Sequence, residues 1–202
     1  MATKLQNSMF IHIPKTGGRW VNNMLFKAVK GAESIGDPIY DAHDSPDIDL
    51  PVFAFVRHPI ELANSLWCHR SRKHSNTRHK DWNWQQDIEF ERVCGDSDYN
   101  KYFENVAANP KIITSYYYHF IGKYKKVRLG RMETIAEDLV KILINYEESF
   151  NEDFIRANAM NKIGSGSDQI NLPKDIYNQI MKNEEDFCLQ FGYTEQEEVN
   201  AS

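Results

Sequence analysis

The fold is indicated first by the stretch from Met9 to Gly18, which reads MFIHIPKTGG. Its first five residues form an apolar run of strand length, and the proline and paired glycines after them are typical of a tight loop. From Trp20 onward, apolar residues recur at helical spacing. Gly31 favours the end of this helix, because glycine is common just after the last helical residue. The stretch therefore predicts a buried strand, a tight loop and a helix, in that order.

The same order recurs further along the chain. Residues 52–56, VFAFV, are five consecutive apolar residues, as in a strand covered on both faces, and Pro59 suits the first turn of a helix. Residues 126–131 predict a third strand, which a helical pattern through Leu143 follows. Repeated strand-then-helix order predicts an α/β fold with a parallel sheet and crossover helices.

The remaining segments are less informative. Apolar spacing from Pro173 to Phe191 predicts a helix near the end of the chain. The basic stretch 69–81 and the Gly/Ser stretch 164–168 match neither a helix nor a strand pattern, so they are candidate mobile loops.

Composition limits the class of protein. The length of 202 residues suits a single domain, 1–202, with a mobile insert around 69–97. The content of 41% hydrophobic and 26% charged residues is typical of globular chains. No apolar run reaches the roughly 18 residues that span a bilayer, and the first eight residues do not look like a signal peptide. Three widely separated cysteines favour a reducing cytoplasm, and a net charge of −5 argues against a nucleic-acid partner.

The loop from Pro14 to Gly18 has the chemistry of an anion site. Glycines let backbone N–H groups converge, a helix N-terminus adds partial positive charge, and Lys15 adds a full charge. The order differs from the nucleoside-triphosphate loop G-x-x-x-x-G-K-(S/T), because the lysine precedes the glycines, and this weakens an ATPase or kinase interpretation. The alternative is a simple strand-to-helix turn with a surface lysine.

A second candidate anion site follows the second predicted strand. Arg57 stands directly after that strand, and Ser65 lies eight residues further on, in the predicted helix. An arginine at the carboxyl end of a strand can bind a phosphate in a forked geometry, and a serine can donate to the same oxygens. Two such sites suggest a doubly phosphorylated ligand; the alternative is a helix cap with a surface serine.

Together these segments resemble the sulfotransferase superfamily. Its donor loop reads Pro-Lys-(Ser/Thr)-Gly-(Gly/Thr)-(Ser/Thr), and its second motif is an arginine after a strand with a serine eight residues later. Both patterns occur here in order, and the segments 131–139 and 185–193 are similar to the family's strand–helix junction and C-terminal Phe-Gly-Tyr. The resemblance implies a P-loop-NTPase-like, three-layer α/β sandwich with a central parallel sheet.

The resemblance also implies a ligand, 3′-phosphoadenosine 5′-phosphosulfate (PAPS), which leaves as 3′-phosphoadenosine 5′-phosphate (PAP). The 5′-phosphosulfate would bind the loop, and the 3′-phosphate would bind Arg57 and Ser65. The loop residues concerned are Lys15, Thr16, Gly17, Gly18, Arg19 and Trp20. Arg19 replaces the family's usual Ser or Thr and Leu62 stands where an arginine is common, so the role of Arg19 is open and one basic residue is missing.

Sulfuryl transfer needs positive charge at the leaving phosphate and a base for the acceptor, but no metal. Lys15 suits the first role. His43 suits the second, because histidine titrates near neutral pH and residue 43 lies between the two donor motifs, where related enzymes place a catalytic His or Glu. The alternative bases are Asp44, Glu89 and Glu91, and His43 could instead be a loop residue bonded to a neighbouring aspartate.

Three functions follow from these observations. The first is transfer of a sulfuryl group from PAPS to a hydroxyl of a carbohydrate or another small acceptor. The second is a nucleotide or small-molecule kinase, and the third is a non-catalytic nucleotide-binding protein of the same fold. The basic, tryptophan-bearing stretch from His69 to Trp84 fits either a solvated loop or a lid over the ligands. The acceptor and the oligomeric state stay open.

Overall fold

A computed structural model describes residues 2–35, 49–71, 84–160 and 170–193. The chain divides into two compact units, which we call the sheet unit (Met1–Arg57 and Tyr117–Ser165) and the helical unit (His58–Tyr116 and Gly166–Ser202). The single domain expected from the sequence stays a prediction. Of the insert expected around 69–97, residues 72–83 lie outside the described residues. Its described part contains the end of α2 (Pro59–Ser71), where the sequence analysis found no helix pattern, and the helix α3 (Glu89–Cys94).

The sheet unit contains five strands in its described part: β1 (Ala2–Lys4), β2 (Met9–Ile11), β3 (Glu33–Ile35), β4 (Val52–Val56) and β5 (Val127–Arg131). Their order is β3-β1-β2-β4-β5. β2, β4 and β5 are parallel, whereas β1 is antiparallel to both β2 and β3. The protein is therefore α/β, but its sheet is mixed, and the expected central parallel sheet is limited to β2, β4 and β5.

The antiparallel part has a local cause that the sequence analysis missed. The amide of Leu5 donates to the carbonyl of Ser8 at 2.9 Å, which closes a tight turn between β1 and β2. Strands joined by so short a turn can only pair antiparallel. The parallel strands follow the β-α-β order that the sequence predicted.

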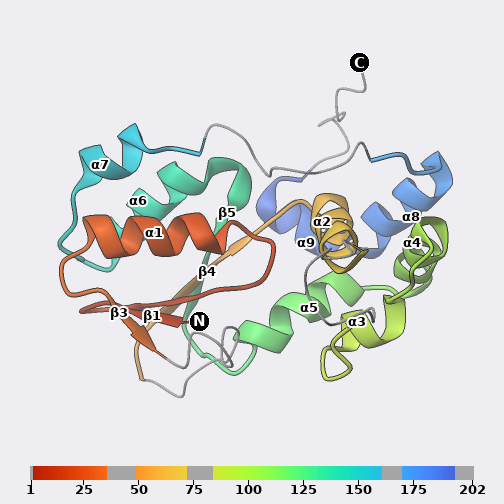
Figure 1. Cartoon of the computed structure of the whole chain (residues 1–202), viewed down its shortest axis with the longest axis horizontal. Coiled ribbons are helices and arrows are strands. Elements are labelled where there is room, and N and C mark those ends of the chain that lie inside the picture. Colours follow the sequence, from red (N-terminus) through yellow and green to blue (C-terminus); the bar gives the residue numbers. More distant parts are fainter. Residues whose placement is uncertain (1, 36–48, 72–83, 161–169, 194–202) are drawn as a thin grey trace, which may run out of the picture. The chain divides into compact units, whose positions relative to one another are not determined.

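One face of the sheet carries the core of the sheet unit. Phe10, Phe53 and Phe55 pack there with residues of α1 (Gly18–Ala28), α6 (Ile135–Asn145) and α7 (Glu152–Ala157). Figure 1 shows these three helices together on one side of the strands. Side chains alternate along a strand, so Val52, Ala54 and Val56 point to the other face. All five residues of β4 are buried, as expected for a strand covered on both sides.

Most of the predicted elements are confirmed. α1 begins at Gly18, two residues before the predicted start, and buries its apolar stripe of Val21, Met24, Leu25 and Ala28. The second predicted strand is β4, with the predicted bounds, and α2 (Pro59–Ser71) begins at the proline. The third strand–helix pair is β5 followed, after a short 3₁₀ turn (Met132–Thr134), by α6.

The helical unit contains α2, α3 (Glu89–Cys94), α4 (Tyr99–Ala108), α8 (Lys174–Asn183) and α9 (Glu185–Phe191). α8 packs on α2 and α4. The helix α5 (Ile112–Ile121) begins in this unit and ends in the sheet unit. Among the helices that the structure describes, none has the length and apolar character that a membrane crossing requires.

The helix predicted over 173–191 is two helices, broken at Glu184. The Glu184 carboxylate is buried and accepts from the amide of Ile113 at 2.9 Å, and from the amide and hydroxyl of Thr114 at 3.1 and 2.6 Å. It therefore caps the N-terminus of α5 from a distant part of the chain. Periodicity could not reveal the break, because the apolar stripe continues through it.

Candidate functional site

The candidate site begins with the loop between β2 and α1. Lys15 and Gly17 both adopt left-handed backbone conformations, with φ of 68° and 83°, and Gly17 is the N-cap of α1. For Lys15 such a φ is sterically costly, which is a feature more common at functional sites than elsewhere. The first N–H groups of a helix have no acceptor within the helix, so this loop offers them to an anion.

The two glycines of the loop are required by close packing. A Cβ atom at Gly18 would lie 1.9 Å from Cδ2 of His12, at the end of β2, and one at Gly17 would lie 2.6 Å from Cδ1 of Ile135 in α6. Any side chain at either position would therefore displace a neighbour. The loop is held between the strand end and α6.

The side chain of Thr16 faces the loop itself. Thr16 is fully buried, and its hydroxyl donates to the carbonyl of Ile13 at 2.9 Å. The hydroxyl thus closes the turn. What Thr16 can offer a ligand is its backbone N–H.

Arg57 joins this loop to the second predicted motif. It follows the last residue of β4, is only 3% exposed, and places Nη1 3.5 Å from the carbonyl oxygen of Lys15. β2 and β4 are parallel neighbours, so their carboxyl ends meet at one edge of the sheet. We call this edge, with the loop, Arg57 and the end of β5, the carboxyl edge.

Arg131 brings a third basic residue to the carboxyl edge. It ends β5 and is paired in register with Val56, the residue before Arg57. Its amide donates to Asp138 Oδ2 at 2.8 Å, and its Nε lies 3.8 Å from Glu133 Oε2. The Asp138 carboxylate also accepts from the Thr134 hydroxyl at 2.9 Å, so it fixes the junction between β5 and α6.

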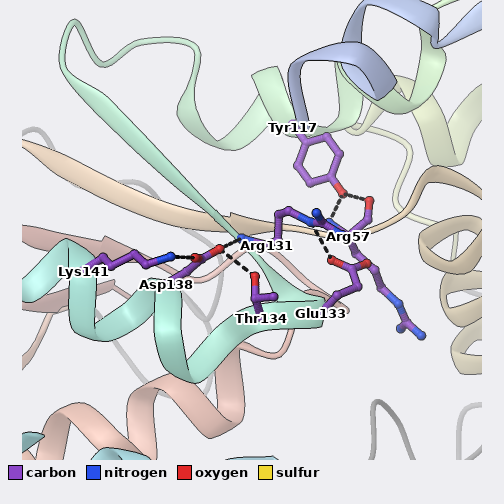
Figure 2. A network of polar contacts seen from close by, with 7 residues as sticks. All are labelled: Arg57, Tyr117, Arg131, Glu133, Thr134, Asp138 and Lys141. Carbon is purple, nitrogen blue, oxygen red and sulfur yellow. Dashed lines mark hydrogen bonds and ion pairs between the residues drawn. The ribbon is translucent and has the colours of Figure 1, made fainter. Parts of the chain in front are cut away.

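Sequence reasoning missed two residues of the site. Arg131 ends a predicted strand, so the argument that placed Arg57 at a sheet edge could have found it as well. Tyr117, in α5, places its hydroxyl 3.0 Å from the amide nitrogen and 3.1 Å from the carbonyl oxygen of Arg57 (Figure 2). Nothing in the run of three tyrosines that contains Tyr117 marks it for this role.

The other residues expected to bind PAPS do not all lie at the carboxyl edge. Arg19 is exposed in the first turn of α1, and the indole N–H of Trp20 donates to the carbonyl of Asn158 at 2.9 Å, which ties α1 to the end of α7. Ser65 lies on α2 and is partly exposed. Ser65 belongs to the helical unit and Arg57 to the sheet unit, so their binding of one phosphate stays a prediction.

The candidate bases are described only in part. His43, Asp44 and the stretch 72–83 lie outside the described residues. Glu91 is buried in the helical unit, where its carboxylate accepts from Arg70 Nη2 at 2.6 Å and from the amide of Gln85 at 2.8 Å. That carboxylate links α3 to Arg70 of α2. Glu89, in contrast, is exposed at the start of α3.

Comparison of the chain with protein-family models, with curated proteins and with solved structures found no match.

Proposed function

We propose that this protein is a sulfotransferase, which moves a sulfuryl group from PAPS to a hydroxyl of a carbohydrate or another small acceptor and releases PAP. The observation that carries the proposal is the 3.5 Å approach of the Arg57 guanidinium to the Lys15 carbonyl. Two segments that resemble the family's donor motifs, 42 residues apart in sequence, thus meet at one edge of the sheet.

The residues at the carboxyl edge fit the donor's charged groups. The 5′-phosphosulfate would take the backbone N–H groups from Thr16 to Arg19 and the ammonium of Lys15, at the N-terminus of α1. Gly18 is the first residue of α1, and packing against His12 leaves no room for a side chain there. The 3′-phosphate would take the forked N–H groups of Arg57, with the Ser65 hydroxyl as a second donor.

Each protein group has a definite task in the transfer. PAPS supplies the sulfuryl group: the acceptor oxygen attacks the sulfur and forms a new S–O bond, while the bond between the sulfur and the 5′-phosphate oxygen breaks and PAP leaves. Lys15 holds positive charge where the departing phosphate oxygen becomes negative, which stabilises the transition state more than the ground state. His43 takes the proton from the acceptor hydroxyl.

The proposal extends to the three-layer fold of sulfotransferases and to a location in the cytoplasm. The parallel strands β2, β4 and β5, with α1 between β2 and β4 and with α6 after β5, are the part of the chain consistent with a P-loop-like three-layer sulfotransferase fold. A cytoplasmic protein that needs no metal completes the proposal.

The test is transfer of labelled sulfate from PAPS to a panel of glycans, phenols, steroids and amines. The wild-type protein should label at least one class, and Lys15→Ala should lose most of that transfer. Tight binding of PAP without transfer to any acceptor would favour the non-catalytic alternative. Metal-dependent phosphate transfer from ATP would favour the kinase.

A further inference from the structure

The hydroxyl of Tyr117 makes two hydrogen bonds to one residue, Arg57. It accepts from the Arg57 amide at 3.0 Å and donates to the Arg57 carbonyl at 3.1 Å, as Figure 2 shows. Tyr117 and Arg57 are each only 3% exposed. A tyrosine hydroxyl has one donor hydrogen and free lone pairs, so it can satisfy both groups at once.

Arg57 needs such a partner because of its place in the sheet. The last register pair between β4 and β5 is Val56 with Arg131, so Arg57 lies one residue beyond the ladder. Buried backbone groups that leave a ladder must find other partners. The Tyr117 hydroxyl serves as that partner and holds both sides of the Arg57 main chain in one orientation.

The orientation of the Arg57 main chain sets the direction of its side chain. That side chain reaches the loop between β2 and α1, with Nη1 3.5 Å from the Lys15 carbonyl oxygen. Without the two hydrogen bonds, the Arg57 main chain could rotate and its guanidinium would be held less closely to the loop. An arginine that binds in a fork depends on such orientation, because both of its hydrogen bonds must be aligned.

The tyrosines on either side of Tyr117 have other environments. Tyr116 is buried in the helical unit, where its ring packs edge-on against Phe90 at a centroid distance of 5.4 Å. Tyr118 is 66% exposed. The chain therefore offers a matched control, since Tyr118→Phe removes the same atom from the next residue of the same helix.

We propose that Tyr117 is a positioning residue that makes the site selective for a nucleotide with a 3′-phosphate, acting through Arg57. The inference rests on the proposed function, in which Arg57 holds the 3′-phosphate of the donor. It adds that α5, which sequence comparison with the donor motifs does not include, sets the preference for a 3′,5′-bisphosphate over a 5′-monophosphate.

The test is calorimetric titration of PAP and of 5′-AMP into the wild type, Tyr117→Phe, Tyr118→Phe, Arg57→Ala and the double variant Arg57→Ala/Tyr117→Phe. Tyr117→Phe removes both hydrogen bonds to the Arg57 main chain. It should weaken PAP binding about 2- to 10-fold, which is the range that corresponds to the contribution of a typical hydrogen bond, and leave AMP binding unchanged. Tyr118→Phe should bind both nucleotides like the wild type. In the Arg57→Ala background, Tyr117→Phe should add nothing, because it acts only through the arginine.

The outcomes separate the inference from the function. A wild type that prefers PAP to AMP, with Tyr117→Phe equal to Tyr118→Phe, overturns the inference alone. Equal loss of PAP and AMP binding in Tyr117→Phe shows a general structural role and also overturns it. A wild type with no preference for PAP overturns the proposed function as well.

A second measurement needs no variant. Amide hydrogen exchange, followed by NMR in the wild type, should show the Arg57 amide protected by the Tyr117 hydroxyl. Exchange at the rate of an exposed loop amide would contradict the contact on which the inference depends, even if Tyr117→Phe failed to fold.

Discussion

The Arg57 guanidinium approaches the main-chain carbonyl of Lys15, with 3.5 Å between Nη1 and the oxygen. Lys15 lies in the loop after β2 and Arg57 directly follows β4, and these strands are parallel neighbours, so the sheet brings both residues to one edge. Arginine beside a lysine-bearing loop concentrates positive charge, which a highly charged anion can neutralise.

Replacement of Lys15 by alanine should reduce turnover much more than donor affinity. Its charge is proposed to act on the leaving phosphate, where negative charge develops in the transition state, so we expect a loss of about 10²–10³ in kcat and a far smaller change in PAP affinity. Steady-state kinetics and calorimetry measure the two effects. Lys27→Ala, at the exposed end of α1, is the matched control. Equal losses in turnover and affinity would assign Lys15 to binding alone.

Removal of metal ions should leave transfer nearly intact. Sulfuryl transfer as proposed uses Lys15 and Arg57 for the donor's charge, so excess EDTA should change the initial rate little. The assay compares rates before and after dialysis against EDTA, with Mg²⁺ added back. A rate that disappears with EDTA and returns with Mg²⁺ would favour phosphoryl transfer.

If His43 is the general base, the rate should rise with pH through a pKa near the usual 6.5 of histidine. His43→Gln should lose about 10²–10⁴ in turnover while PAP still binds. His69→Gln, at the exposed end of α2, should have a smaller effect. Wild-type turnover in the His43 variant would move the role to Asp44 or Glu89. Glu91 is disfavoured, because its carboxylate is buried and paired with Arg70.

Glu184 should make stability depend on pH. Burial raises the pKa of its carboxyl above the ordinary 4.5, although hydrogen bonds from Thr114 and Ile113 oppose the shift. Between the unfolded and folded pKa values only the folded state keeps the proton, so the free energy of unfolding should fall as pH rises through that window. Relative to Glu184→Gln, the wild type should therefore lose stability from about pH 4.5 upward.

Urea unfolding of both proteins across that range measures the difference. Glu185→Gln is the control, because Glu185 is the exposed neighbour of Glu184. A difference between wild type and Glu184→Gln that stays constant with pH, or grows in favour of the wild type, would contradict the assignment of a raised pKa.

Much of the sheet unit could be predicted, because its elements carry local signals. β4 is a continuous apolar run, and α1 has a clean 3.6-residue stripe that ends before Gly31. β1 and β3 are three residues each and too short for a period to be seen. The break at Glu184 depends on a partner 70 residues away, Thr114, which no local pattern records.

The position of a candidate site residue was predictable where that residue follows a recognisable strand. Lys15 and Arg57 were found in this way, and Arg131 could have been. Tyr117 could not, because its hydrogen bonds to Arg57 depend on where this end of α5 lies beside the end of β4 and not on its neighbours in sequence. For Thr16, the motif predicts a contact with the ligand, but in the structure its hydroxyl donates to the carbonyl of Ile13.

The central claim is that the carboxyl edge binds an adenosine 3′,5′-bisphosphate through Lys15 and Arg57. The most direct measurement is calorimetric titration of PAP into the wild type and Arg57→Ala, over a range of salt concentrations. We expect binding that weakens steeply with salt and that Arg57→Ala weakens by about 1.5–3 kcal/mol, the usual contribution of a hydrogen bond to a charged group. Unchanged PAP affinity in Arg57→Ala, or no PAP binding to the wild type, would contradict the account.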